Sequence, residues 1–591
     1  MSTFRIPNST GQIVISDRSE TTGQILESFS IDINNPFGKI KPSNKLVKIL
    51  DETDLDNSRL QALAVYKRQG SSAATYYYAV ATGYVSVCPT TQDPTDATKW
   101  EDINDAFAGT FNAGNLGEES DAVVFNDLLL MSRAQDILSW NGTIDDPDWW
   151  TTVTLGGETG PSLTADVPHT MHVHKGGLET LFVTNGNLVH YANTESGHST
   201  ITLATDQVAT CLTSGVDAIW AGTYSTSSDS AYVYEIFIGQ TSEGTDASPS
   251  VPIANTGFKI DGRAVLSMEV IDNIPYIITD KGNLQVFTGA GFKTIQRLPF
   301  AATSSVLDGM RIGNIDKDNT QRPVHPKGMR ADNGSLFINI NTETDNVGDQ
   351  DPMAKKTASG VWEYNSDTRQ LHHRFTFANA AINNGSELHN FTGPLMIVDS
   401  PYTFLMAGAE IDGTTSGLFM ETNSKYGYFI TPEILSGVVQ DSYKNLFIKA
   451  TNNGTINVKY RTTKKADQFA TFTLADANTI NTTDTISVSV GDEVTMIDGA
   501  AHGAVAHVIS ISSSATVTSL TLDTDIGTAG QAGTARITNF HKFAKKYDEA
   551  KEYDQWGSDE VNPWIQYKVE MLGELEIRDL ISDGQAKTNI G

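Results

Sequence analysis

A hairpin-like stretch occurs twice in this chain, and it limits the possible folds more than any other feature. Residues 180–194 read TLFVTNGNLVHYANT, and residues 275–290 read PYIITDKGNLQVFTGA. Each copy has an apolar, strand-like run, a turn that ends in Gly-Asn-Leu, and a second strand-like run. Gly186 and Gly282 can supply the positive φ that a tight hairpin turn needs. A recurring hairpin of this kind predicts a fold built by radial or stacked repetition.

Seven segments between residues 60 and 434 share this pattern of short apolar strands. Their starts are spaced by roughly 40 to 60 residues, which is the size of a four-stranded propeller blade with its loops. Helical periodicity is nearly absent, so the chain is predicted to be all-β, with a β-propeller of about seven blades. The segments are 63–87, 122–140, 180–194, 218–238, 275–290, 335–364 and 402–421.

The pattern changes beyond the propeller region. Residues 445–462 alternate around the turn signal that ends in Gly454, and residues 564–581 alternate around Gly573, which predicts two hairpins of a C-terminal β-sandwich. Residues 473–538 lie between them and are rich in Ala, Thr, Ser and Gly. Tight glycine turns there predict a small barrel of about five strands, inserted at a hairpin tip because such tips tolerate insertions.

These patterns give a predicted domain organisation. At 591 residues the chain is too long for one ordinary core. We expect an N-terminal arm and closing strand at 1–44 and the β-propeller at 45–434. The C-terminal β-sandwich is expected at 435–472 and 539–591, with the inserted small β-barrel at 473–538.

Charge and composition argue against several classes of protein. The chain has 71 acidic and 41 basic residues, a net charge of −30, which disfavours sequence-independent binding of nucleic acid. No apolar run approaches the roughly 18 residues of a membrane helix. The opening residues, MSTFRIPNSTGQ, lack the basic and apolar regions of a secretory signal. Two distant cysteines, Cys88 and Cys211, exclude a disulfide framework and a cysteine-based zinc site.

Three histidines, His169, His172 and His174, form the clearest candidate for a metal site. On a strand, His172 and His174 point to the same face, as metal ligands do. The alternative is a blade strand with its histidines at a solvent-lined edge, and we favour it because no carboxylate accompanies them at a fixed spacing. The pair His372-His373 alternates faces, so we expect a structural role for it.

Acidic stretches offer two further candidates. Residues 316–319 and 345–351 are oxygen-rich and could hold Ca²⁺, but neither has EF-hand spacing, which favours solvated loops. Asp145-Asp146 stands beside Trp149-Trp150, and glycosidases use acid pairs next to aromatic platforms. Adjacent residues do not supply the gap that a sugar requires, so we favour a connector between blades.

Sequence motifs of catalysis are missing. The chain has no G-x-S-x-G, H-E-x-x-H, P-loop or G-x-G-x-x-G. The turn at 228–230 lacks the glycine and tryptophan of a sialidase Asp-box. We therefore expect no catalytic residue, no cofactor and no metal, and a protein that is not an enzyme.

The phrase SFSIDINNPFGKIKPS at 28–43, followed by about seven blades and a C-terminal sandwich, resembles virion proteins of tailed bacteriophages. In particular, it is similar to the propeller-bearing tail tubular protein B, or nozzle, class of short-tailed phages. That resemblance implies a non-enzymatic protein that forms a ring, commonly of six copies, below the adaptor that follows the portal, with DNA passing through the ring. It implies the virion as location after synthesis in the host cytoplasm, with the tail adaptor, tail fibre or other virion proteins as partners.

Two other functions remain open at this level. Propellers and sandwiches both present shallow loop-built sites, so a receptor- or glycan-binding module would use exposed aromatics such as Trp149, Trp150 and Trp220. A hydrolase would instead need carboxylates that converge on the central channel of the propeller.

Overall fold

The structure of the protein is a computed structural model. It describes residues 3–5, 27–32, 40–50, 60–67, 75–81, 85–103, 121–133, 136–140, 150–152, 154–155, 158–159, 161–164, 167, 169–175, 179–193, 198–227, 230–237, 253–254, 256–298, 323–341, 359–378, 391–398, 404–410, 416–431, 434–435, 442–462, 467–496, 504–514, 516–543, 554–557 and 564–586. These residues form an all-β structure whose one helical element is the 3-10 turn η1 (Ala97–Lys99). None of the described helical segments is long and apolar enough to span a membrane.

The chain divides by contacts into two compact units. The first comprises Met1–Val47, Ala358–Leu388 and Glu421–Gly591, and the second comprises Lys48–Thr357 and His389–Met420.

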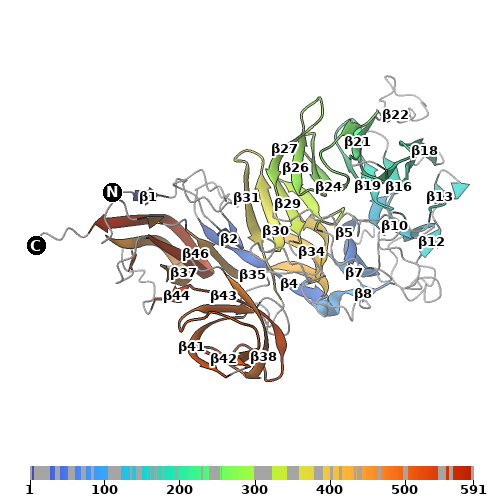
Figure 1. The fold of residues 1–591 in the computed structure, drawn as a ribbon. Coiled ribbons are helices and arrows are strands. Elements are labelled where there is room, and N and C mark those ends of the chain that lie inside the picture. The colour runs from blue at the N-terminus through green and yellow to red at the C-terminus, as the bar shows by residue number, and fades with distance from the viewer. Residues whose placement is uncertain are drawn as a thin grey trace, which may run out of the picture. The chain divides into compact units, whose positions relative to one another are not determined.

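Six sheets form a propeller-like ring, drawn in blue to yellow in Figure 1. Each contains an antiparallel meander of the type that a propeller blade has. In chain order they are β5 (Leu60–Lys67), β6 (Thr75–Ala81), β7 (Val85–Pro89) and β8 (Glu101–Asp102); β9 (Ala122–Phe125), β10 (Leu128–Arg133), β11 (Asp136–Trp140) and β12 (Trp150–Thr152); β15 (Met171–His174), β16 (Thr180–Asn185), β17 (Leu188–Asn193) and β18 (Ser199–Thr202); β19 (Gln207–Ser214), β20 (Ala218–Ser225), β21 (Tyr232–Phe237), β22 (Ile253–Ala254) and β23 (Phe258–Lys259); β24 (Val265–Ile271), β25 (Ile274–Thr279), β26 (Asn283–Phe287) and β27 (Phe292–Arg297); and β28 (Met329–Asp332), β29 (Ser335–Ile340), β30 (Gly360–Asn365) and β31 (Gln370–Phe375). A separate two-stranded sheet pairs β13 (Thr154–Leu155) with β14 (Glu158–Thr159).

The first strands of consecutive sheets lie next to one another. β5 contacts β9, β9 contacts β15, and the series continues through β19 and β24 to β28. β33 (Phe391–Val398) contacts both β28 and β5, so it lies between the last and the first of these strands. It pairs with β34 (Phe404–Glu410), which pairs in turn with β35 (Ser416–Ile430).

Apolar side chains between neighbouring sheets form the core of the ring. One cluster joins the first two sheets around Trp140, and others join the second to the third, the third to the fourth and the fourth to the fifth. A further cluster joins the first sheet to β33–β35 around Met406 and Leu418. The first four sheets therefore bury apolar residues on both faces against their neighbours, as stacked blades do.

The repeated hairpin of the sequence occupies the same place in two of these sheets. Residues 180–193 form β16 and β17, and residues 275–287 form β25 and β26, which are the second and third strands of their sheets. Gly186 has φ +63° and Gly282 has φ +75°, so both glycines supply the expected left-handed turn conformation. The prediction that the repeat is a propeller unit is confirmed.

The same pair of hydrogen bonds links the start of the first strand to the end of the second strand in several sheets. Thr170 N–H donates to Thr184 Oγ1 (2.8 Å), and Thr184 N–H donates back to Thr170 O (3.0 Å). Ser132 makes the same two hydrogen bonds with Asp121, one through its side chain and one through its backbone N–H, and Asp280 makes them with Ala264. A short polar side chain at the end of the second strand thus satisfies the backbone that leads into the first.

The first unit holds a long two-stranded ribbon. β37 (Ser442–Arg461) and β46 (Trp564–Ala586) pair antiparallel from Ser442–Ala586 to Arg461–Gln566 (Figure 1). The prediction of two separate hairpins is wrong, because each segment runs straight through its glycine and pairs with the other. Gly454 lies opposite Gly573, and a Cβ on Gly454 would lie 2.1 Å from Leu572 O, so this glycine permits a close backbone approach.

The ribbon belongs to a larger sheet with the order β3-β4-β35-β46-β37-β44. Residues 28–43, which carried the phage resemblance, contribute strands to it: β2 pairs with β35, and β3 pairs with β4. Its remaining elements are β1 (Thr3–Arg5), β2 (Glu27–Phe29), β3 (Ile31–Asp32), β4 (Lys41–Leu50), β32 (Phe377–Ala378), β36 (Ile434–Leu435), β44 (His541–Lys542) and β45 (Asp554–Gly557).

A closed barrel of six strands lies between β37 and β46 in the sequence. Its strand order is β38-β39-β42-β41-β40-β43, and Figure 1 shows it in orange. The inserted barrel is confirmed, with six strands where about five were predicted, and its first strand begins at Gln468 rather than near residue 473. The strands are β38 (Gln468–Asp476), β39 (Thr479–Thr482), β40 (Glu493–Met496), β41 (Val505–Ser513), β42 (Thr518–Leu522) and β43 (Ala532–Thr538).

Candidate functional site

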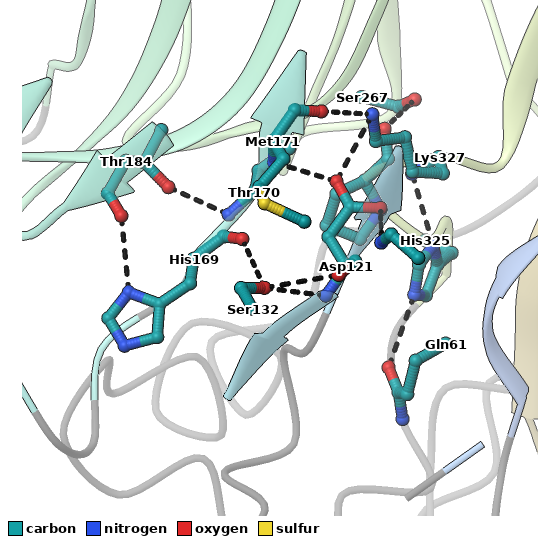
Figure 2. Close-up of polar contacts among 12 residues, drawn as sticks. Gln61, Asp121, Ser132, His169, Thr170, Met171, Thr184, Ser267, His325 and Lys327 are labelled. Atoms are coloured by element: carbon teal, nitrogen blue, oxygen red, sulfur yellow. Dashed lines mark hydrogen bonds and ion pairs between the residues drawn. The ribbon is translucent and has the colours of Figure 1, made fainter. Parts of the chain in front are cut away.

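Polar residues gather where the first strands of the propeller sheets begin, and this cluster is the candidate site (Figure 2). Asp121 directly precedes β9, and Thr170 directly precedes β15. Lys327 lies two residues before β28, and Ser267 lies within β24. Because the first strands of neighbouring sheets are in contact, these positions converge although they are far apart in sequence.

Asp121 and Lys327 form a buried ion pair in this cluster. Lys327 Nζ lies 3.1 Å from Asp121 Oδ2, and the two side chains are 11% and 6% exposed. The ammonium also donates to Met171 O at 2.6 Å. Asp121 accepts from Met171 N–H at 2.7 Å and from Ala122 N–H at 2.8 Å. The pair therefore ties together the starts of β9, β15 and β28.

Hydroxyl groups extend this network to further sheets. Ser132 Oγ donates to His169 O at 2.9 Å, which links the second and third sheets. Thr170 Oγ1 donates to Thr210 O at 2.9 Å, which links the third and fourth. Ser267 Oγ donates to Pro326 O at 3.0 Å, which links β24 to the chain before β28.

His325 links the same segment to the first sheet. Lys327 N–H donates to His325 Nδ1 at 3.0 Å, which leaves the ring proton on Nε2. His325 Nε2 then donates to Gln61 Oε1 of β5 at 3.4 Å. With these contacts the network reaches all six sheets.

A second, more exposed pair lies along the same first strands. Arg330 Nη1 is 3.4 Å from Glu269 Oε2, with side chains 30% and 19% exposed. Thr213 Oγ1 donates to Glu269 Oε1 at 3.4 Å, and His172 Nε2 lies 2.8 Å from Ser214 Oγ. Asp121 and Glu269 are therefore each paired with a basic side chain.

The three clustered histidines do not converge on one point. His169 Nδ1 donates to Thr184 O at 3.1 Å, whereas His172 contacts Ser214. His169 and His174 are both buried, so the expected solvent-lined edge is wrong for these two residues. Burial, followed by the nearby cation Lys327, holds the pKa of His172 well below its usual value. Among the described residues, no group of three His, Cys, Asp or Glu side chains could hold a metal ion.

His373 has a structural position in the first unit. Its Nδ1 accepts from Ser30 N–H at 2.9 Å, and its Nε2 donates to Ser359 O at 2.9 Å. Phe29 stacks on the ring with centroids 4.6 Å apart. Its neighbour His372 lies 3.6 Å from Glu363 Oε2. The two adjacent histidines thus have different partners.

The aromatic and acidic candidates have varied outcomes. Trp220 is 4% exposed and lies in β20, the second strand of its sheet, with its ring 4.9 Å from that of Phe287, so the expectation of an exposed contact is wrong. The acid pair 145–146, Trp149 and the oxygen-rich stretches 316–319 and 345–351 lie outside the described residues.

Sequence reasoning missed Asp121 and Lys327. Neither belongs to a motif, and the pair forms only when two distant blades become neighbours. The available signal was positional: Asp121 and Thr170 each stand one residue before a first strand. At that position the backbone N–H donates to the polar side chain at the end of the second strand of the same sheet. The same position lies beside the start of the next sheet.

Chemically, this arrangement favours positioning over reaction. The Asp121 carboxylate accepts two backbone N–H groups and pairs with Lys327. The lone pairs of this buried carboxylate are therefore engaged by donors of the protein itself. The cluster therefore acts as a polar fastening between blades.

Comparisons with known proteins give weak likenesses. No protein-family model and no curated protein matches the chain. Among solved structures, virginiamycin B lyase from Staphylococcus aureus is similar over 64% of this chain and 99% of its own, with 10% identity and a TM-score of 0.38. The N-terminal domain of Nup159 is similar over 70% and 99%, with 11% identity and a TM-score of 0.35. The computationally designed Ika8 protein gives 64% and 99%, 10% identity and a TM-score of 0.34. Likenesses this weak carry no argument about the activity of this chain.

Proposed function

We propose that this chain is a non-enzymatic structural subunit of a phage tail, which assembles with copies of itself into a nozzle-like ring that contributes to the DNA-ejection conduit. The observation that carries the proposal is the fastening cluster around Asp121 and Lys327. In this propeller-like ring the polar groups at the starts of the first strands hold blades together. A rigid platform of this kind suits a protein whose task is assembly.

Charge supports the same role. With 71 acidic and 41 basic residues, the chain repels the phosphate backbone. A duplex that passes an acidic conduit stays mobile because like charges keep it from adhering. DNA is then cargo, and the partners are further copies of this chain, the tail adaptor, and tail fibre or other virion proteins. Residues 28–43, which resemble the nozzle class, supply the remaining support.

The proposal includes a seventh blade and a C-terminal sandwich. β33 contacts β28 on one side and β5 on the other, and the cluster around Met406 packs β33–β35 against the first sheet. Both contacts are those that a last blade makes when it closes a ring. For the sandwich, the support is the apolar cluster that the ribbon forms with Ile31, Phe429 and Trp556.

Labelling of particles tests the role. An antibody raised against the barrel, applied to phage particles that carry this gene, is expected to mark one site at the tail in negative-stain images. Particles with portal and adaptor proteins but no copy of this chain, detected by mass spectrometry, would refute the proposal.

A further inference from the structure

The barrel and the ribbon have separate apolar cores. The barrel core is built around Phe472, Val494 and Leu520, and all its buried members come from residues 472–537. The ribbon core is built around Ile448 and Val569 and draws no described buried residue from the barrel strands. No shared apolar cluster therefore holds the two together among the described residues.

The covered outer face of the barrel is polar. In β40, Val494 and Met496 point into the barrel, so Glu493 and Thr495 point outward, as alternation along a strand requires. Glu493 is nevertheless 0% exposed and Thr495 4% exposed. His507, Arg536 and Thr538 alternate with core residues in the same way and are also buried. Buried outward side chains mark a surface that another part of the chain covers.

Two lysines of the ribbon meet Glu493 on this surface. Lys568 Nζ of β46 donates to Glu493 Oε1 at 2.8 Å, and Lys459 Nζ of β37 donates to Glu493 Oε2. Lys459 also donates to Glu570 Oε1 of the ribbon at 2.6 Å. In this cluster the barrel thus contributes the carboxylate of Glu493, and the ribbon contributes two lysines and the carboxylate of Glu570.

Two further contacts at the edge of the joint also place a carboxylate of the barrel against a side-chain nitrogen of the ribbon sheet. His541 Nε2 lies 3.4 Å from Asp492 Oδ1, and Lys542 Nζ lies 2.8 Å from Asp523 Oδ2. Asp492 and Asp523 belong to barrel loops, whereas His541 and Lys542 form β44, which pairs with β37 of the ribbon. In each of these contacts the carboxylate therefore comes from the barrel and the side-chain nitrogen from the ribbon sheet.

Several polar atoms of the joint have no hydrogen-bond partner among the described residues. They include Thr495 Oγ1, Thr538 Oγ1 and both ring nitrogens of His507. The His507 nitrogens lie 3.8 Å from Glu493 and 3.9 Å from Asp523, too far for hydrogen bonds. Burial lowers the pKa of His507 to about 3, so its ring is neutral at pH 7. Water would satisfy these atoms if the joint opened, which lowers the cost of opening.

We propose that the barrel is a separable module, which docks on the ribbon through this charge-matched joint and can leave it without the unfolding of either core. Docking depends on Glu493, because its carboxylate is the barrel group that contacts both Lys459 and Lys568 of the ribbon. Such a joint lets the barrel change position while the ribbon and its sheet stay intact.

Spin-label distance measurements on the full chain test this inference. Nitroxides are placed at Ser512→Cys in the barrel and Thr455→Cys in the ribbon, both exposed positions. Cys88 and Cys211 are buried and stay unlabelled in the folded protein. Dilution with unlabelled protein restricts the signal to distances within one chain, so the result does not depend on assembly of the ring. The unaltered joint is expected to give one narrow distance distribution.

Glu493→Gln is the informative variant, and Glu570→Gln is its matched control. Both remove one buried carboxylate that contacts Lys459, but only Glu493 belongs to the barrel. Loss of one partner of a buried ion pair raises the undocked population roughly 100-fold. We expect a broad, longer distribution for Glu493→Gln, a narrow one for Glu570→Gln, and protected barrel amides in hydrogen exchange for both.

Three results would overturn the inference. The first is a narrow, unchanged distribution in Glu493→Gln, since docking would not then depend on that charge. The second is equal broadening in both variants, which would make the cluster a general stabiliser of the ribbon. The third is loss of amide protection in the barrel of Glu493→Gln, since the barrel would then not be a separable module.

Discussion

Replacing Lys327 with methionine tests the fastening role of the central ion pair. Methionine keeps the length and most of the volume of the side chain but removes the charge and the donor. Asp121 would remain, 6% exposed on its side chain, with two backbone N–H donors and no cation. Removal of one partner from a buried ion pair costs about 3–5 kcal/mol. Met171 O would also lose its 2.6 Å donor.

Hydrogen exchange measures this loss locally, which suits a chain of several domains. A loss of about 3 kcal/mol corresponds to opening that is roughly 100-fold more frequent, and a larger loss raises this factor further. We therefore expect amides of β9 and β15 in Lys327→Met to exchange about 100-fold faster than in the unaltered protein. Adding Asp121→Asn should restore part of the protection, since the uncompensated charge is then gone.

Arg330→Met is the matched control. Arg330 pairs with Glu269 at 3.4 Å, with side chains 30% and 19% exposed. Partly exposed pairs contribute about 0–1 kcal/mol, so this variant should exchange within roughly fivefold of the unaltered protein. Exchange rates in Lys327→Met equal to those in Arg330→Met would refute the assignment of Asp121 and Lys327 as the main fastening.

Three further predictions follow from single positions. Gly186 has φ +63°, and an added Cβ would meet no atom within 4 Å, so only backbone strain opposes a substitution there. Gly186→Val should therefore lower the urea midpoint of unfolding through a strain of about 1–2 kcal/mol, while Gly186→Asn should stay near the original midpoint. Equal midpoints for the two variants would contradict the turn argument. Burial raises the pKa of Cys88 and of Cys211 to about 12. A thiol-reactive disulfide reagent at pH 8 should therefore detect no thiol until guanidinium unfolds the chain. Fast reaction of the native protein would show that a thiol is accessible. Burial lowers the pKa of His373 to about 4, from 6.5 in the unfolded chain. As the pH falls, the unfolded chain therefore binds the proton first, and the free energy of unfolding decreases between about pH 6.5 and pH 4. His373→Gln should make this pH dependence of stability weaker, and an unchanged dependence would count against a buried neutral ring.

The sequence predicted those parts of the fold whose signal is local. The Gly-Asn-Leu turns of residues 186–188 and 282–284 carry their own geometry, and the structure gives both glycines a positive φ. The glycine-rich stretch after residue 473 likewise marks its own turns, so the barrel was predictable to within one strand. A hairpin needs only neighbouring residues to be recognised.

Pairing between distant segments was not predictable in this way. Residues 445–462 alternate in the same way whether they fold back at Gly454 or pair with a remote strand, because alternation reports only which face is buried. In the structure this segment pairs with the remote strand β46, with Ile456 opposite Met571 and Val458 opposite Val569. Asp121 and Lys327 are a second case, since the pair exists only once the first strands of separate blades meet.

Burial of single aromatics was a third limit. Trp220 was expected to be an exposed contact residue of a receptor- or glycan-binding module. Its strand, β20, lies between β19 and β21, and its ring packs against Phe258, Phe287 and Phe292. Only the packing of the fourth sheet on the fifth shows that this face is covered.

The mass of the assembled species tests the proposed ring most directly. One chain has a mass of 63.9 kDa. Mass photometry of the purified protein across a concentration series, with negative-stain images of the largest species, should show one closed ring whose mass is a fixed multiple of that value. A single species of 63.9 kDa at every concentration, together with images that hold no rings, would contradict it.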